Sequence, residues 1–182
     1  VCWACLLALA GIGRAEWTIW SADPETGEWE HAQNWSGGVP GSGLDAWIDD
    51  STTHPQISGT VEHPEEEEHL LNARSLWIGP EGTGTVEHSG NKILVVARDV
   101  VLGDKSQEVI PDLGTGVYVL RDDAQLWVDG DLKMGMDWEG GIVTKGSTGV
   151  FDMSGGRVTV GGTVSMAAYY DAQTSFTQEN GT

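Results

Sequence analysis

Tryptophan is the residue type in this chain whose number and spacing point most directly to chemistry. Nine of the 182 residues are tryptophan. The flat, apolar indole can stack on a pyranose ring, so clustered tryptophans are candidates for a sugar-binding platform. The same rings can instead close the end of a hydrophobic core, and we favour this cap interpretation for the cluster near the N-terminus. The cluster comprises Trp17, Trp20, Trp29, Trp35 and Trp47.

Trp77 and Trp127 are better candidates for ligand contact. Each stands in a short run between two apolar residues (Leu76 and Ile78, Leu126 and Val128), so its ring is expected to face the opposite side of a strand. Such outward rings are available to a polysaccharide or another surface component. Isolated exposed aromatic residues also occur without any ligand, so both interpretations stay open.

Two acidic features are possible cation sites. Residues 63–69 read His-Pro-Glu-Glu-Glu-Glu-His, and carboxylates or imidazoles could ligate a metal ion there. Asp122, Asp123, Asp129 and Asp131 could hold calcium at the corners of a repeat. A run of like charge is usually a solvated loop, and no Gly-Gly-x-Gly-x-Asp repeat is present. We therefore predict no metal and no cofactor.

Catalytic motifs are missing from the sequence. It contains no G-x-S-x-G, no H-E-x-x-H and no P-loop. His88 is the only histidine of the repeat region, and it takes the place of an apolar residue. A hydrogen-bonded histidine in the core is the expected role. The chain is accordingly predicted not to be an enzyme.

The first fifteen residues have the composition of an export signal. They are apolar, too short to span a bilayer, and end on the small residue Ala15, so cleavage is expected between Ala15 and Glu16. A basic segment is missing before them, which indicates that the sequence starts inside the signal. A buried N-terminal strand is the alternative. Cleavage would remove Cys2 and Cys5, leaving no cysteine for disulfides or metal binding.

The acidity of the chain limits the classes of partner that it can bind. With 9 Lys and Arg against 28 Asp and Glu, the net charge is −19. Such a charge disfavours nucleic acid and anionic membrane surfaces. No later segment is long and apolar enough to span a membrane, so we expect an exported protein that is secreted or displayed at the cell surface.

The second half of the sequence repeats. With Gly84, Gly116 and Gly149 aligned, spaced 32 and 33 residues apart, six columns of the following twenty residues are apolar in nearly every copy. They are Val86/Tyr118/Phe151, His88/Leu120/Met153, Leu94/Leu126/Val158, Val96/Val128/Val160, Val100/Leu132/Val164 and Leu102/Met134/Met166. Between these columns the residues vary, and an outward position such as Lys133 is expected to tolerate a change of charge.

Period-two alternation over three short runs per copy predicts three strands, each with one buried face. One such unit cannot close a core alone, but stacked units can. We therefore predict an all-β fold, a parallel β-solenoid of three-strand rungs with a Trp-rich N-terminal cap. The expected organisation is a signal at 1–15, the cap with its acidic loop at 16–69, and repeats at 70–182, the last one truncated. A β-sandwich also has short alternating strands, but it does not explain the recurring columns.

The cap region and the repeats together resemble a known group of proteins. The opening consists of Gly27-Glu28-Trp29, Asn34-Trp35-Ser36, Gly38-Val39-Pro40-Gly41 and Asp45-Ala46-Trp47-Ile48. With repeats such as Gly82-Thr83-Gly84-Thr85-Val86 and Ser154-Gly155-Gly156-Arg157-Val158, it is similar to bacterial surface proteins of the autotransporter-type β-strand repeat or PEP-CTERM-sorted kind.

This resemblance implies secretion and a structural or adhesive role. The predicted function is thus a non-enzymatic extracellular or cell-surface β-solenoid, possible partners being polysaccharide or other matrix components. The alternatives are the front part of a β-solenoid carbohydrate-active enzyme, whose site would lie beyond Thr182 on one solenoid face, and a simple carbohydrate-binding module.

Overall fold

Short strands alternate with sharp turns along the whole described chain. The computed structural model describes residues 17–21, 26–49, 53–105, 114–137, 147–166 and 173–179. These residues form 15 strands and two short 3-10 helices, η1 (Ala32–Asn34) and η2 (Glu67–His69). All pairs between these described strands are parallel. The all-β prediction is confirmed.

The strands assemble into three parallel sheets. The first sheet contains β1 (Trp17–Ile19), β2 (Asp45–Ile48), β5 (Leu76–Ile78), β8 (Val100–Lys105), β11 (Leu132–Asp137) and β14 (Val164–Met166). The second contains β3 (Gln56–Ile57), β6 (Thr83–His88), β9 (Thr115–Leu120), β12 (Thr148–Met153) and β15 (Gln173–Gln178). The third contains β4 (Leu70–Ala73), β7 (Ile93–Val96), β10 (Gln125–Val128) and β13 (Arg157–Val160).

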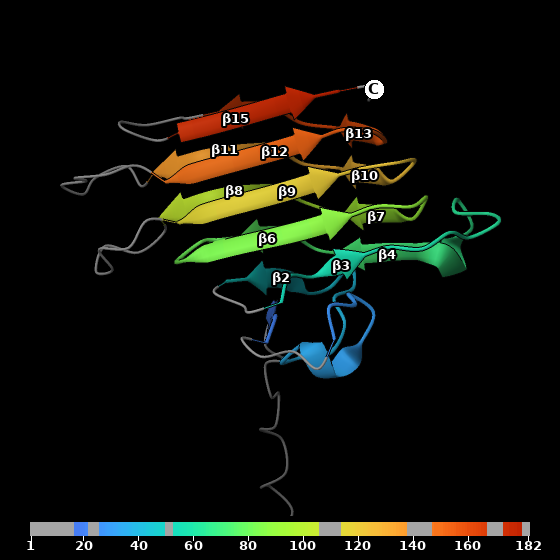
Figure 1. Cartoon of the computed structure of the whole chain (residues 1–182). Helices are drawn as coiled ribbons and strands as arrows, with labels where there is room; N and C mark the ends of the chain where they lie inside the picture. Colours follow the sequence, from blue (N-terminus) through green and yellow to red (C-terminus); the bar gives the residue numbers. More distant parts are fainter. Residues whose placement is uncertain are drawn as a thin grey trace, which may run out of the picture.

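The chain visits the three sheets in a fixed order, so successive visits build the turns of a β-solenoid. The sets β2-β3-β4, β5-β6-β7, β8-β9-β10 and β11-β12-β13 make about four turns, and β14 and β15 lie above them. Figure 1 shows these turns stacked one above another, with the N-terminal segments at one end of the stack. This arrangement confirms the predicted β-solenoid of three-strand rungs.

The columns of the sequence repeat are the side chains that stack inside the solenoid. Leu126 pairs in register with Leu94 on one side and Val158 on the other. Leu132 pairs in the same way with Val100 and Val164. Because these partners are hydrogen-bonded neighbours in parallel sheets, the β-sandwich alternative is wrong.

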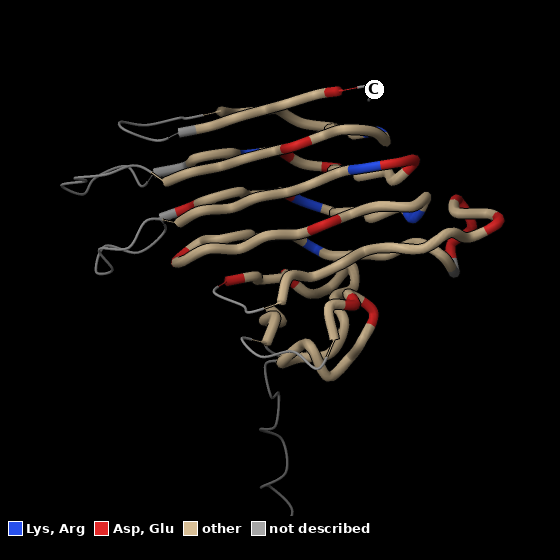
Figure 2. The backbone as a smooth tube through the Cα atoms, in the orientation of Figure 1, with Lys and Arg blue, Asp and Glu red and all other residues tan. Residues whose placement is uncertain are grey.

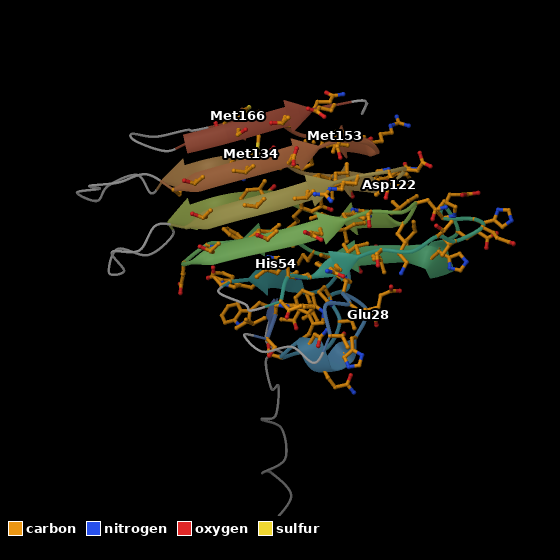
Figure 3. The ribbon with its side chains drawn as sticks, in the orientation of Figure 1. Glu28, His54, Asp122, Met134, Met153 and Met166 are labelled. Atoms are coloured by element: carbon orange, nitrogen blue, oxygen red, sulfur yellow. The ribbon has the colours of Figure 1, made fainter. Side chains whose placement is uncertain are left out.

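The inward columns are fully buried in the middle turns and become exposed in the upper one. Met134 on β11 has 0 % of its surface exposed, whereas its register partner Met166 on β14 is 45 % exposed (Figure 3). Val164 and Phe176 are also exposed, at 49 % and 40 %. The side chains of one turn are covered by those of the turn above, and no described turn lies above β14.

Glycine is required where the first sheet passes into the second. Gly84, Gly116 and Gly149 are each the second residue of a strand of the second sheet, at a point where two backbones meet. A Cβ atom on Gly149 would lie 2.6 Å from the amide nitrogen of Gly135 and 2.7 Å from the carbonyl oxygen of Leu102. The residue at this corner therefore cannot carry a side chain unless the backbone shifts.

The sheets continue below Leu70, into the region expected to be only a cap. Ala46 and Ile48 on β2 pair with Leu76 and Ile78, and Ile57 on β3 pairs with His88. Leu70, the expected start of the repeats, thus falls inside the first full turn rather than at its edge. The short β2 and β3 carry none of the glycines used to align the repeat, so the repeat pattern did not extend to them.

Candidate functional site

Three of the five N-terminal tryptophans form the predicted cap. Trp20, Trp29 and Trp35 are 1 %, 1 % and 4 % exposed. The Trp35 ring packs edge-on against both others, with centroid distances of 5.0 Å to Trp20 and 4.8 Å to Trp29. The Trp35 indole N–H donates to the Trp29 carbonyl oxygen at 2.7 Å. These rings close the lower end of the core.

Asn34, which precedes Trp35 in the sequence, holds the cap loop together. Its buried side-chain amide donates to the carbonyl oxygens of Thr26 (2.9 Å) and Glu28 (3.0 Å). Lys92, which lies between β6 and β7, forms an ion pair with Glu30 of this loop. The ion pair joins the cap loop to the solenoid. The Asn-Trp pair of the opening motif therefore has a structural role.

Trp17 and Trp47 are not part of the buried cap, and the cap interpretation is wrong for them. Trp17 is 54 % exposed and Trp47 is half-buried. The reason is the strand pleat: on β2, Ala46 and Ile48 point inward, so Trp47 between them points outward. Register pairing places Ile19 of β1, Trp47 of β2 and Trp77 of β5 in one outward column.

We call Trp17, Ile19, Trp47, Trp77 and Glu81 the aromatic face. The rings of Trp47 and Trp77 are stacked, with centroids 5.9 Å apart and an interplanar angle of 20°. Trp17, Ile19, Trp47 and Glu81 line a hollow of about 330 Å³ on the outside of the first sheet. Trp77 backs Trp47 without lining the hollow itself. This volume is at the lower end of the range of small-molecule sites.

Asp49 fixes the edge of the aromatic face. One oxygen of its carboxylate accepts the backbone N–H of Gly82 at 2.9 Å, and the other accepts that of Glu81 at 3.1 Å. The indole N–H of Trp47 also points to Asp49, at 3.4 Å. These contacts orient Trp47 and the backbone of Glu81. The Glu81 carboxylate forms no ion pair with any residue that the structure describes.

The two tryptophans expected from sequence to face outward do so on different sheets. Trp77 lies on the first sheet, in the aromatic face. Trp127 lies on β10 of the third sheet, where its indole N–H donates to Gln125 at 3.2 Å. The structure does not bring them together. Ile19 and Glu81 were missed, and Trp17 and Trp47 were assigned to the cap. Aligning Asp45-Ala46-Trp47-Ile48 with Ser75-Leu76-Trp77-Ile78 would have placed Trp47 in the column of Trp77.

A cluster of charged side chains lies on the first sheet, beyond the aromatic face, around Lys133 of β11. Lys133 binds the carboxylates of Asp99 (2.6 Å) and Asp131 (3.4 Å). Each aspartate also accepts a backbone N–H of the turn above, from Asp131 and Thr163 respectively, both at 2.9 Å. The hydrogen bond to Asp99 raises the pKa of Lys133, and that from Thr163 lowers the pKa of Asp131. These carboxylates serve as links between turns.

This geometry corrects the expectation that Lys133 tolerates any charge. Its ammonium group neutralises two neighbouring carboxylates, so an aspartate at position 133 would add a third negative charge to the pair. The outward orientation was predicted correctly, but a sequence pattern cannot show which aspartates come within reach from the adjacent turns.

The possible cation sites have no assembled ligand set among the described residues. No group of three or more His, Cys, Asp or Glu side chains gathers there. Asp122, at the turn between β9 and β10 (Figure 3), accepts the backbone N–H of Gly90 at 3.1 Å and has a φ of +57°. In the loop before β4, where Figure 2 shows several red acidic positions, His63 lies 3.8 Å from Glu65 and both are exposed.

His88 is the hydrogen-bonded core histidine that the sequence predicted. Its Nε2 lies 3.0 Å from the Lys92 carbonyl oxygen, which can only accept, so Nε2 carries the proton. Nδ1 therefore accepts the hydroxyl of Tyr118, at 2.8 Å. Burial lowers the pKa of His88 to about 4, and burial also raises the pKa of Tyr118.

The buried His88 predicts a stability that falls on mild acidification. The unfolded chain takes up a proton on this histidine below its ordinary pKa of 6.5, whereas the folded chain does so only near 4. The stability is therefore complete above pH 6.5 and decreases as the pH falls toward 4. Between pH 7 and pH 4.5 the loss is roughly 2 kcal/mol, measurable by urea unfolding.

His88→Leu is the matched variant, because leucine occupies this column in the next turn. It leaves the Tyr118 hydroxyl without its acceptor, so the variant is less stable at pH 7. Its stability should nevertheless change less between pH 7 and pH 4.5 than that of the original protein. Equal pH dependence in both proteins would contradict the assignment.

Comparison with protein-family models, with curated proteins and with solved structures found no match to this chain. Among the described residues, no helix has the length and apolar character needed to cross a membrane. The expected cleavage site between Ala15 and Glu16 lies outside the described residues. The sheet topology and the buried tryptophans define the class of this protein: a parallel β-solenoid with a tryptophan cap and an aromatic outer face.

Proposed function

We propose that this chain is a non-enzymatic structural and adhesive β-solenoid that works outside the cell, secreted or displayed at the surface. The observation that carries the proposal is the stack of about four parallel turns held in register by continuous inward columns. Such a stack is a stiff body whose outer faces stay free for partners.

Links between turns add to the rigidity that this role requires. Asp99 and Asp131 each bind a backbone amide one turn away. Asn91 exchanges two hydrogen bonds with the backbone of Val61, at 2.9 and 2.7 Å. Because these bonds run along the axis of the stack, they resist separation of the turns.

The proposed relationship to bacterial surface repeat proteins rests on the opening motif. Trp29, Asn34 and Trp35 of that motif build the cap, and Gly38 adopts a φ of +88° next to it. The Gly38 carbonyl oxygen accepts the hydroxyl of Thr18 on β1, at 2.9 Å. A cap of this kind supports a solenoid role, because an uncovered first turn would expose core side chains and strand edges.

The proposal predicts where the natural protein is found and how it starts. Protein isolated from its source should be in the extracellular or surface fraction, and N-terminal sequencing should begin at Glu16, since Ala15 ends the apolar leader. A protein inside the cell that retains Val1 would contradict export. Release of reducing sugar from a polysaccharide by the purified protein would contradict the non-enzymatic role.

A further inference from the structure

The aromatic face combines apolar rings, a hollow and the carboxylate-bearing Glu81, which forms no ion pair within the described part of the chain. Trp17 and Ile19 are 54 % and 42 % exposed on β1, the edge strand of the first sheet. Exposed apolar side chains of this size, next to one another, mark an interaction site more often than scattered single residues do. The position on regular strands fixes the rings relative to each other.

The direction of the face fits a chain-like ligand. Ile19, Trp47 and Trp77 follow the solenoid axis from strand to strand, and two strand spacings correspond to roughly 10 Å. This length exceeds a single sugar ring. Trp47, backed by Trp77 and oriented by Asp49, presents its remaining surface to the hollow.

Charge decides between classes of ligand. The chain carries a net charge of −19, and Glu81 is the charged residue among the described residues that line the hollow. An anionic glycan is therefore repelled, as is a second copy of this equally acidic chain. An ammonium group gains both from the carboxylate and from the faces of the indole rings.

We propose that the aromatic face binds a polysaccharide of amino sugars whose amino groups are free and positively charged. The pyranose rings lie against Trp17 and Trp47, and an ammonium group pairs with Glu81. The inference rests on the proposed extracellular function, because such a polymer is met outside the cell.

Calorimetric titration of the purified protein with a glucosamine hexamer tests the inference. Binding is expected, and it should exceed binding of the N-acetylated hexamer, which lacks the charge. Trp17→Ala should weaken binding by about tenfold or more, the size typical of a tryptophan at the centre of a contact. Glu81→Gln should weaken it about two- to fivefold and reduce the preference for the free amine.

Trp127→Ala is the control, because it removes an outward tryptophan from the third sheet and should leave the affinity unchanged. Trp17 is exposed, so its removal should leave the unfolding temperature nearly unchanged. The inference is overturned by absent binding, by equal binding of both hexamers, or by an equal loss in Trp127→Ala. Self-association abolished by Trp17→Ala would overturn it as well, by showing a second copy on the face.

Failure of this inference and failure of the proposed function are separate results. A protein that begins at Glu16, is recovered from the cell surface and binds no hexamer keeps its structural role and loses only the proposed ligand. A protein that remains inside the cell loses the proposed function, whatever it binds in a titration.

Discussion

Replacing Val128 by aspartate should destabilise the fold by about 4–5 kcal/mol, as expected for an unpaired charge in the core. Val128 is 2 % exposed and lies in register between Val96 and Val160. None of these neighbours can pair with a carboxylate, so the variant must bury a charge, protonate it or open the turn. Urea unfolding should show a large fall in the midpoint or no folded baseline at all.

Thr159→Asp is the appropriate control for this substitution. Thr159 is exposed on β13 and pairs with Trp127 in the outward column of the same sheet. Its replacement should cost less than about 1 kcal/mol, the range of strand propensity. Lys133 is unsuitable as a control because of its two ion pairs. Equal losses in Val128→Asp and Thr159→Asp would contradict the assignment of inner and outer faces.

Gly149→Ala should cost about 3 kcal/mol, the upper part of the usual range for overpacking. The added methyl group would meet backbone atoms of Gly135, Leu102 and Met134 at 2.6, 2.7 and 2.9 Å. Backbone atoms cannot move aside as a flexible side chain can, so the corner between the first and second sheets must distort. The unfolding temperature should fall by roughly 6–12 °C.

Gly43→Ala provides the matched comparison within the same chain. A Cβ atom at Gly43 meets no atom within 4 Å, and Gly43 is not among the glycines with positive φ. The substitution should leave stability unchanged or raise it slightly, because alanine restricts the unfolded chain. If both variants unfold at the same temperature, the close contact at the corner is not real.

Much of the solenoid could be predicted because its information is local and repeated. Each inward column alternates with variable residues, and the glycines at 84, 116 and 149 mark the same corner in three turns. When similar units stack, burying every inward column requires that equivalent positions of successive turns pair with one another. Leu94, Leu126 and Val158 pair in this way, as expected. The core histidine followed from the same columns.

The first turns and the aromatic face were harder to predict because they lack the repeat. β2 and β3 contain four and two residues, too few to show a period on their own. Composition grouped Trp17 and Trp47 with the buried tryptophans, since it cannot tell on which side of a strand a ring lies. The ion pairs of Lys133 were hidden for another reason: Asp99 lies 34 positions away in sequence, and the contact depends on which side chains adjacent turns bring together.

The central claim, that like positions of successive turns stack, is tested most directly by methyl NOE spectroscopy of the folded chain. The structure predicts NOEs from the Leu126 methyl groups to those of both Leu94 and Val158, because neighbouring strands lie about 4.8 Å apart. Leu132 should show the same pattern with Val100 and Val164. If Leu126 and Leu132 instead show NOEs only to residues outside these columns, the solenoid is contradicted, and the proposed function loses its basis.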